Sequence, residues 1–243
     1  MSHLCVEHIT KSFSENMVLT DLHFLVEKEE FVTILGPSGS GKSTIFNLIG
    51  GLLTPDSGEI RLDGYNIIGS RGSISYMPQT PALLPWRTVL QNVLLGAELK
   101  GESDKSRALK MLEKAGLSDY INARPEQLSG GMKQRVAFIR ALLSPQSLIC
   151  LDEPFSALDE LTRLDMQKWL LSIWEEYRRT IVFVTHSIEE ALFLSDRILV
   201  LSPKPASISA EFKIPFPRPR RESLLLDEEF LMWKRKIYYT LEK

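Results

Sequence analysis

The chain has 243 residues, a length that suits one domain or one domain with a subdomain. Hydrophobic residues make up 44% and charged residues 25%, as in ordinary globular proteins, and the formal net charge of −2 excludes a global basic field that recruits nucleic acid. The first residues lack a signal-peptide pattern, and no apolar run approaches the ~20 residues that a membrane span needs. We therefore expect a cytosolic chain whose membrane association, if any, goes through a partner.

The first part of the chain predicts strands and turns around one short helix. Alternating apolar and polar residues at 4–9 indicate a half-buried strand, and the apolar, β-branched run at 31–35 indicates a buried one. The apolar residues at 45–49 predict a helix that ends at a glycine pair. Further strands are expected at 18–26, 59–64 and 74–78. The neighbours of Phe13 favour it as a core aromatic.

A helical block is predicted at 83–145, inserted into an otherwise alternating chain. Its helices are expected after Thr88, at 103–116 and after Ser129, and the two hydroxyls can cap the helices that follow them. The later elements are strands at 147–151, 180–184 and 198–201 and a long helix at 158–177. Strands that alternate with helices predict a doubly wound, largely parallel α/β sheet.

The last forty residues are predicted to be extended at first and then helical. Five prolines between 203 and 219 indicate loops and edge strands. The basic run at 218–221 is interpreted as solvated charge because the flanking sequence is acidic. Residues 227–241 predict an amphipathic helix. Its apolar face consists of Phe230, Trp233, Ile237 and Leu241. We expect this helix to pack on its own domain, with contact to a neighbouring chain as the alternative.

Residues 36–44 match the phosphate-binding pattern G-x-x-x-x-G-K-S, between the predicted strand at 31–35 and the predicted helix at 45–49. The glycines let backbone N–H groups turn toward an anion, and the helix N-terminus adds a partial positive charge. Lys42 can then reach the β- and γ-phosphates of a nucleotide, and the hydroxyl of Ser43 can hold Mg²⁺. The strand and the helix favour this interpretation over an ordinary glycine-rich turn.

Two carboxylates, Asp152 and Glu153, follow the predicted apolar strand at 147–151. Because strands of an α/β sheet end in the ligand crevice, Asp152 can hold Mg²⁺ and Glu153 can act as a general base toward an attacking water. A helix-capping pair in a loop is the alternative. His186 directly follows another strand and can donate a hydrogen bond to the γ-phosphate. A purely structural histidine is the alternative there.

A second small-residue helix start lies at 129–131, where the sequence is Ser-Gly-Gly. Such a start can form a second anion site. Since the loop at 36–44 already serves the phosphates of this chain, the second site is expected to serve the nucleotide of another chain.

Together these motifs resemble those of the ATP-binding cassette (ABC) ATPases, over essentially the whole chain up to about residue 202. In the order of that family they are Walker A (36–44), the Q-loop glutamine Gln79, the signature (128–134), Walker B (148–152) with Glu153, the D-loop (156–159) and the switch histidine His186. The resemblance also makes Phe13 the A-loop aromatic that stacks on adenine, in place of a core residue.

The resemblance implies a P-loop NTPase core with a mostly parallel sheet, an antiparallel β subdomain and an inserted α-helical subdomain. It implies a single ABC ATPase domain over 1–243. The implied parts are the nucleotide-binding core (1–82 and 146–202), the helical signature subdomain (83–145) and a C-terminal extension (203–243). The implied cofactors are ATP and Mg²⁺.

The resemblance also assigns roles to individual residues. The implied catalytic residues are Lys42, Gln79, Glu153 and His186. The implied metal ligands are Ser43, Gln79 and Asp152. The implied nucleotide contacts are Phe13, Gly36, Pro37, Ser38, Gly39, Ser40, Gly41, Lys42, Ser43, Thr44, Ser129, Gly130, Gly131 and Asp159.

The partners implied by the resemblance are a second copy of the chain and an integral membrane permease. Two ATP molecules would lie between Walker A of one copy and the signature of the other, in a head-to-tail dimer. The segment from Gln79 to Trp86 would receive the permease, with local packing of Trp86 as the alternative. Leu-Pro-Trp at 84–86 and the short tail are similar to the nitrate/sulfonate/taurine importers and to subunits for thiamine-precursor uptake. An extracytoplasmic substrate-binding protein is then an indirect partner, and the expected location is the cytoplasmic face of the membrane.

Other classes of ABC ATPase share the same motifs. A soluble ATPase of a scaffold assembly, of the iron–sulfur cluster biogenesis type, has the same chemistry, and so has an exporter subunit. DNA-repair and translation ATPases carry a coiled-coil insertion or a second cassette, which does not fit in 243 residues. A binding protein and a permease select the substrate of an importer, so this chain does not name it.

Overall fold

The computed structural model describes residues 3–102, 104–156 and 158–242. The expected helix start at Ser103 and the D-loop residue Ala157 lie outside the described residues, as do residues 1–2 and 243 of the expected domain. Among the described residues, no helix combines the length and the apolar composition needed to cross a membrane.

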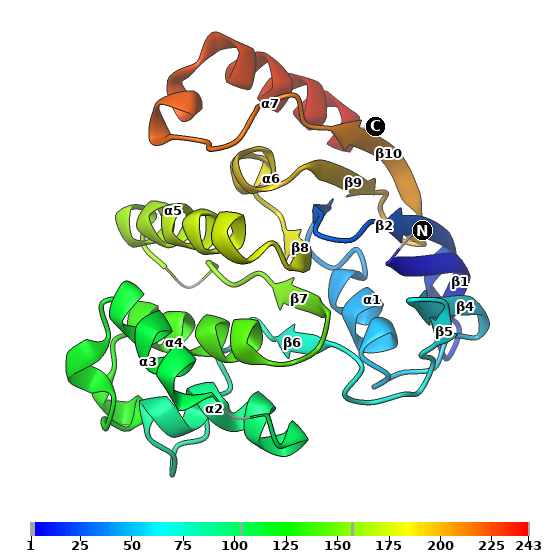
Figure 1. Ribbon diagram of the computed structural model, residues 1–243. Coiled ribbons are helices and arrows are strands. Elements are labelled where there is room, and N and C mark those ends of the chain that lie inside the picture. Colours follow the sequence, from blue (N-terminus) through cyan, green and yellow to red (C-terminus); the bar gives the residue numbers. More distant parts are fainter. Residues whose placement is uncertain (1–2, 103, 157, 243) are drawn as a thin grey trace.

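The larger of two sheets forms the centre of the molecule (Figure 1). In the described part of the chain it has six strands, in the spatial order β10 (Ile208–Lys213), β9 (Arg197–Leu201), β3 (Phe31–Leu35), β8 (Thr180–Thr185), β7 (Leu148–Asp152) and β6 (Ser75–Met77). Neighbouring strands are parallel except β10 and β9, which are antiparallel and form one edge. The largely parallel sheet predicted from the alternation of strands and helices is confirmed.

A second sheet is antiparallel. Its spatial order is β2 (Asn16–Val26), β1 (Leu4–Phe13), β4 (Ser57–Leu62) and β5 (Tyr65–Asn66). Strands β1 and β2 form a hairpin whose register shifts at several bulges. Strand β1 extends beyond the alternation at 4–9 because residues 11–13 stay paired with β2, although their side chains are not buried.

The described residues form seven α-helices, namely α1 (Lys42–Ile49), α2 (Val89–Lys100), α3 (Lys105–Lys114), α4 (Gly130–Leu143), α5 (Glu160–Tyr177), α6 (Ile188–Leu194) and α7 (Glu228–Leu241). Two predicted N-caps are confirmed, since Thr88 accepts a hydrogen bond from Gln91 N and Ser129 accepts one from Met132 N. Helix α6 is absent from the predicted elements. Residues from Glu190 onward in this seven-residue helix are all buried, so the run lacks the helical periodicity of an amphipathic segment.

Both faces of the parallel sheet are covered, as expected for strands without a solvated side. Alternate residues such as Phe31, Ile149 and Phe183 pack with helices α4 and α5. The residues between them, such as Val32 and Val182, pack with α1 and the antiparallel sheet. Helices α2, α3 and α4 lie together beside this core in Figure 1.

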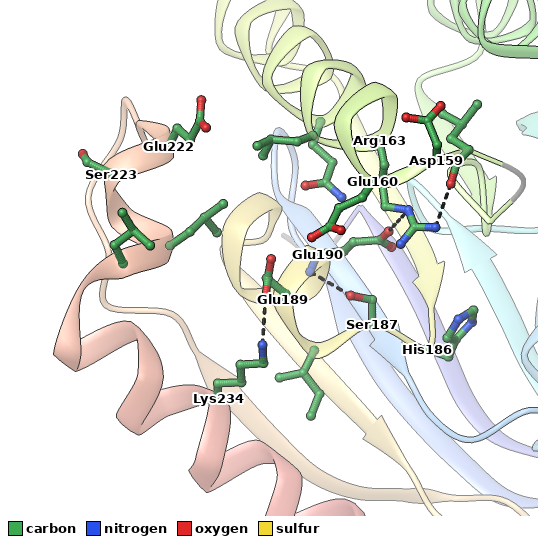
Figure 2. A pocket seen from close by; sticks show the side chains of 16 residues that line it. Asp159, Glu160, Arg163, His186, Ser187, Glu189, Glu190, Glu222, Ser223 and Lys234 are labelled. Atoms are coloured by element: carbon green, nitrogen blue, oxygen red, sulfur yellow. Dashed lines mark hydrogen bonds and ion pairs between the residues drawn. The ribbon is translucent and has the colours of Figure 1, made fainter.

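The C-terminal extension packs against helix α6. Phe230 and Ile237 of α7 are buried among Ala191 and Leu192 of α6, which confirms that this amphipathic helix packs on its own domain. A groove of about 1110 Å³ remains between α5, α6 and the 3₁₀ segment Glu222–Leu226. Figure 2 shows this groove, with His186 near one end.

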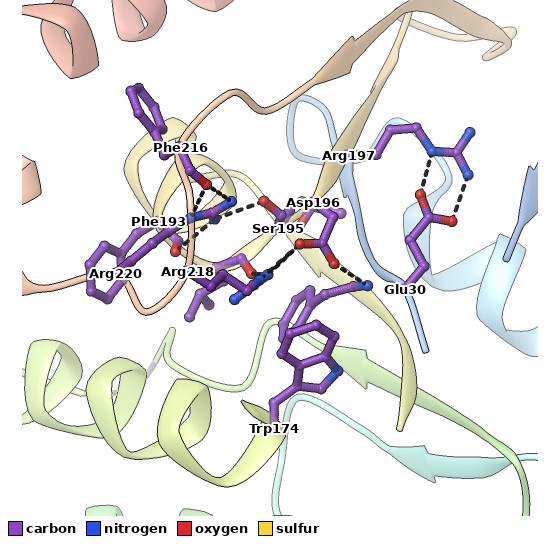
Figure 3. Close-up of polar contacts among 12 residues, drawn as sticks. Glu30, Trp174, Phe193, Ser195, Asp196, Arg197, Phe216, Arg218 and Arg220 are labelled. Atoms are coloured by element: carbon purple, nitrogen blue, oxygen red, sulfur yellow. Dashed lines mark hydrogen bonds and ion pairs between the residues drawn. The ribbon is translucent and has the colours of Figure 1, made fainter. Parts of the chain in front are cut away.

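The prediction of solvated charge at 218–221 is wrong for two of the arginines (Figure 3). Arg220 is only 7% exposed, and its guanidinium donates to the carbonyls of Leu192, Phe193 and Ser195, at the C-terminal end of α6, and to Phe216 O. Arg218 donates to Asp196 Oδ1 and Leu194 O and lies 4.2 Å above the Trp174 ring. Helix ends leave carbonyls without partners, and these two side chains satisfy them. Arg221 is exposed.

Candidate nucleotide site

The parallel strands bring four motifs to one edge of the sheet. Strands β3, β8, β7 and β6 are consecutive neighbours, and parallel strands end on the same side. The loop at 36–44 follows β3, His186 follows β8, Asp152 ends β7, and Gln79 follows β6. The carboxyl edge of such a sheet is where α/β proteins bind their ligands.

The loop at 36–44 leads from β3 into helix α1. Gly41 is the N-cap residue of α1, with a φ of 102° that an L side chain rarely adopts. A Cβ at this position would also lie 2.9 Å from Val18 Cγ1, so only glycine fits. The hydroxyl of Ser40 is buried and has no hydrogen-bond partner within the described part of the chain. The loop therefore presents a helix N-terminus and an unsatisfied hydroxyl.

The ammonium of Lys42 is folded into its own loop. It donates to Gly36 O and Pro37 O, each at 2.9 Å, and lies 3.8 Å from Glu153 Oε1. The side chain is only 5% exposed. Burial lowers the pKa of Lys42, although the charges of Glu153 and Asp152 partly oppose that effect. A poorly solvated cation held by weak carbonyl acceptors is suited to bind a phosphate.

Asp152 is buried at the end of β7. Its Oδ2 accepts a hydrogen bond from the Tyr76 hydroxyl at 3.2 Å. Burial raises the pKa of Asp152, because a desolvated carboxylate disfavours its charge. The strand position does not match the helix-capping pair considered as the alternative for 152–153.

Glu153 stands between the lysine and the histidine. One carboxylate oxygen lies 3.8 Å from Lys42 Nζ, and the other lies 3.1 Å from His186 Nδ1. The backbone of Glu153 has a φ of 42°, an uncommon value for a residue with a side chain. Such a conformation costs about 1–3 kcal/mol and persists where the surroundings impose it. Here Glu153 N donates to Val184 O at 3.0 Å, which ties the residue to strand β8.

Gln79 connects three parts of the molecule. Its Nε2 donates to Ser156 Oγ at 3.1 Å, and Ser156 Oγ donates to Glu153 O at 3.0 Å. Gln134 of helix α4 donates to Gln79 O at 3.4 Å. The loop after β6 is therefore linked both to Glu153 and to the helix that begins at the signature.

Four other predicted groups lie outside this cluster. Phe13 is on the antiparallel sheet and 43% exposed, so the core position inferred from its neighbours is wrong. Ser129 caps α4, and a Cβ at Gly130 would meet no atom within 4 Å. Asp159 caps α5 by accepting from Thr162 N at 3.1 Å. Trp86 is 69% exposed, which contradicts its local packing on the helical block.

Comparisons with known proteins decide the family. The family model described as ABC transporter matches residues 19–156. The chain belongs to the ABC transporter ATP-binding family. As a member, it is an ABC ATPase that binds and hydrolyses ATP.

Relatives of this ABC ATPase cover nearly its whole length. An aliphatic sulfonates import ATP-binding protein, SsuB, of Bacillus cereus is 39% identical over 98% of this chain and 95% of its own length. A formylaminopyrimidine import ATP-binding protein, ThiZ, of Halalkalibacterium halodurans is 43% identical over 90% of this chain and 87% of its own. A dimeric post-hydrolysis ATP-binding cassette bound to ADP and Pi matches with a TM-score of 0.75 and 33% identity, over 88% of this chain and all of that one. The predicted fold class is confirmed.

Sequence reasoning missed several side chains of this ABC ATPase. Tyr76 bonds Asp152, Gln134 bonds the Gln79 carbonyl, and Ser156 bridges Gln79 and Glu153. Tyr76 belongs to a three-residue strand next to β7, so only the pairing of β6 with β7 reveals its place. Gln134 lies in the signature, but the glycines of that motif were the residues to which a role was assigned.

Proposed function

We propose that this ABC ATPase is the energising subunit of a membrane importer. The exposed Trp86 carries the proposal, because a large apolar side chain in water near the Gln79 loop suits a partner surface. The names of SsuB and ThiZ support import over export, and they support a small organic solute of the sulfonate or pyrimidine type. The permease would contact the segment 79–86, on the cytoplasmic face of the membrane. An extracytoplasmic binding protein would supply the solute.

The nucleotide would bind at the N-terminus of α1. Lys42 would exchange its two loop carbonyls for the β- and γ-phosphates, since charged acceptors form stronger hydrogen bonds than neutral carbonyls. Backbone N–H groups of 36–44 would complete the phosphate contacts. Phe13, exposed on the antiparallel sheet, would stack on the adenine.

Magnesium fits the oxygen atoms at this site. The hydroxyl of Ser43 and the buried carboxylate of Asp152 are hard oxygen ligands. Burial raises the pKa of Asp152, and a bound cation would oppose this effect by favouring the charged carboxylate. Among the described residues there is no cluster of three or more His, Cys, Asp and Glu side chains for a metal, so phosphate oxygens and water would complete the coordination, with Gln79 as a further ligand. Bound Mg²⁺ would neutralise charge that develops on the phosphates.

Hydrolysis would use Glu153 as the general base. Its carboxylate would take a proton from the water that attacks the γ-phosphate. His186 would hold that carboxylate through Nδ1, at the 3.1 Å distance seen in the structure, and would contact the γ-phosphate. Gln79 would sense the γ-phosphate and act on Glu153 through Ser156.

Two copies would bind ATP between them. Ser129, Gly130 and Gly131 would face the γ-phosphate of the opposite copy, and Asp159 would lie at the interface. The open space beside Gly130 and the dimeric state of the similar ADP-bound cassette support this arrangement. Hydrolysis would remove a ligand shared by both copies and let the dimer open.

The test is purification of the chain from its own cell membranes in mild detergent. We expect a multi-span permease with the wild type and a much weaker association with Trp86→Asp. The control Tyr65→Asp alters another exposed aromatic, on strand β5 of the antiparallel sheet, and should retain the permease. Soluble companions alone would contradict the proposal and favour a scaffold-assembly ATPase. Export rather than import of solute by vesicles that contain the complex would contradict the transport direction.

A further inference from the structure

Helix α6 begins immediately after His186 with the sequence Ser-Ile-Glu-Glu at 187–190. A serine followed three residues later by glutamate predicts a capping box, in which the glutamate side chain accepts from the N-cap backbone N–H. Only half of that box forms. Glu190 N donates to Ser187 Oγ at 3.3 Å, but Ser187 N donates to Thr185 Oγ1 at 3.0 Å. The carboxylate of Glu190 is therefore not needed for the cap.

The carboxylate of Glu190 instead faces two other elements, and Figure 2 shows the one on the side of Arg163. Thr185 Oγ1, at the end of β8, donates to one oxygen at 2.5 Å. The other oxygen lies 3.9 Å from Arg163 Nε of helix α5. The Glu190 side chain is only 8% exposed. Thr185 and Ser187, which flank His186 in sequence, thus both contact Glu190. Thr185 bonds the carboxylate of Glu190, and Ser187 bonds its backbone N–H.

Arg163 carries the connection onward to the loop before α5. Its guanidinium donates to Leu158 O at 2.8 Å, next to the cap residue Asp159 (Figure 2). Its Nε is buried and forms no hydrogen bond within the described residues, at 3.9 Å from Glu190. A movement on the order of 1 Å would bring this pair into hydrogen-bond range. The Glu190–Arg163 pair therefore spans from the His186 segment to the D-loop.

A buried carboxylate is costly unless it has partners. Burial raises the pKa of Glu190, while the hydrogen bond from Thr185 and the charge of Arg163 oppose this effect. An apolar side chain would fill the same space without that penalty. The charge of Glu190 is thus explained by its contacts with Thr185 and Arg163 rather than by packing.

We propose that Glu190 is a positioning residue for ATP hydrolysis, which fixes His186 through Thr185 and couples it to the D-loop through Arg163. The inference rests on the proposed roles of Glu153 and His186. It predicts that loss of the Glu190 charge slows the chemical step without weakening ATP binding, because the contacts of Lys42 lie on other elements.

The first experiment compares Glu190→Gln with Glu189→Gln. Glutamine at 190 keeps an oxygen for Thr185 but loses the charge that faces Arg163. Glu189 is the adjacent residue, exposed and paired with Lys234 of α7, so it is a matched control in the same groove. We expect kcat for ATP to fall about tenfold or more in Glu190→Gln, since small displacements of reacting groups are costly. KM for ATP should stay within about twofold of the wild type, and Glu189→Gln should behave like the wild type.

A second pair of variants separates positioning from folding. Arg163 is partly exposed, so Arg163→Gln should fold even where a variant at 190 does not. We expect Arg163→Gln to lower kcat as Glu190→Gln does, the double variant to be no slower than either single one, and Arg163→Lys to restore part of the rate. Equal kcat in Glu190→Gln and Glu189→Gln, or a loss confined to KM and melting temperature, would overturn the inference. A wild type that binds ATP but never hydrolyses it would instead contradict the proposed function of the site.

Discussion

Two buried cations of this ABC ATPase make contrasting use of backbone carbonyls. Lys42 donates to two carbonyls of its own loop and lies 3.8 Å from a carboxylate. Arg220 donates to carbonyls of Leu192, Phe193, Ser195 and Phe216, which a helix end and a proline-rich loop leave available. In the proposed function a ligand replaces the partners of Lys42, whereas all three nitrogens of the Arg220 guanidinium already donate to carbonyls. A buried charge is therefore a binding group where its contacts are few and a structural group where they are complete.

The largest effect should be a loss of ATP hydrolysis rate without a loss of stability, at the nucleotide site. Glu153→Gln removes the proposed general base but keeps the shape of the side chain, so hydrolysis should fall about 10²–10⁴-fold. Nucleotide binding should persist, and the ATP-bound dimer should accumulate. Phosphate release at saturating Mg-ATP measures the rate, and size-exclusion chromatography measures the dimer. Glu160→Gln, at an exposed position of α5, is the control. Turnover equal to that of the control would refute the role of Glu153.

The second effect should be a loss of stability without a loss of hydrolysis rate. It concerns Arg220, which anchors the C-terminal segment to the end of α6. Arg220→Met keeps the buried length of the side chain but leaves several carbonyls without donors, which should lower the free energy of unfolding by about 3 kcal/mol. The rate per folded molecule should change little. Urea denaturation provides the stability, and Arg221→Met is the control because Arg221 is adjacent and exposed. If both variants unfold at the same urea concentration, the comparison between the two cations fails.

The smallest effect should be a gain in the free energy of unfolding when a charged residue of the nucleotide site is neutralised. The pKa of Asp152 in the folded, ligand-free chain is raised above its ordinary value of 3.8. The folded state therefore holds this proton to higher pH than the unfolded state, and stability falls as pH rises from about 4 through the raised pKa. Asp152→Asn should then raise stability at pH 7 by about 1 kcal/mol.

Melting curves at pH 7 and pH 4 test this prediction. The difference between Asp152→Asn and the wild type should shrink as the pH is lowered from 7 to 4, because protonation of the folded wild-type carboxyl removes the cost of its buried charge. Mg-ATP should stabilise the wild type more than the variant, because the variant lacks the charge of the proposed metal ligand. An Asn variant that is less stable than the wild type at pH 7 without nucleotide would contradict the assigned cause of the pKa shift.

Local sequence was sufficient where one short segment carries both the fold and the contacts. The carbonyl acceptors of Lys42 in the loop at 36–44 and the donor to the cap at Ser129 lie within a few residues. The strand before Asp152 is predicted from its own apolar run, although it pairs with the distant strands β6 and β8. Arg220 could not be placed this way, because its acceptors at 192–195 lie about 25 residues upstream and become available only when α6 ends. Glu190 was missed for a related reason. Its sequence suggests a cap, and only the placement of α5 beside α6 brings Arg163 to it.

The contacts of Arg220 also tie the end of α6 to the C-terminal segment. The last recognised motif residue is His186, yet the end of α6 depends on side chains from 218 to 220. A chain cut after residue 202 would keep every motif and would lose the donors for those carbonyls, together with the apolar cover from Phe230 and Ile237. Exchange of tails between related ATPases would therefore succeed only if the incoming tail brings its own arginines. The tail residues that α6 needs therefore lie some twenty to forty residues beyond residue 202.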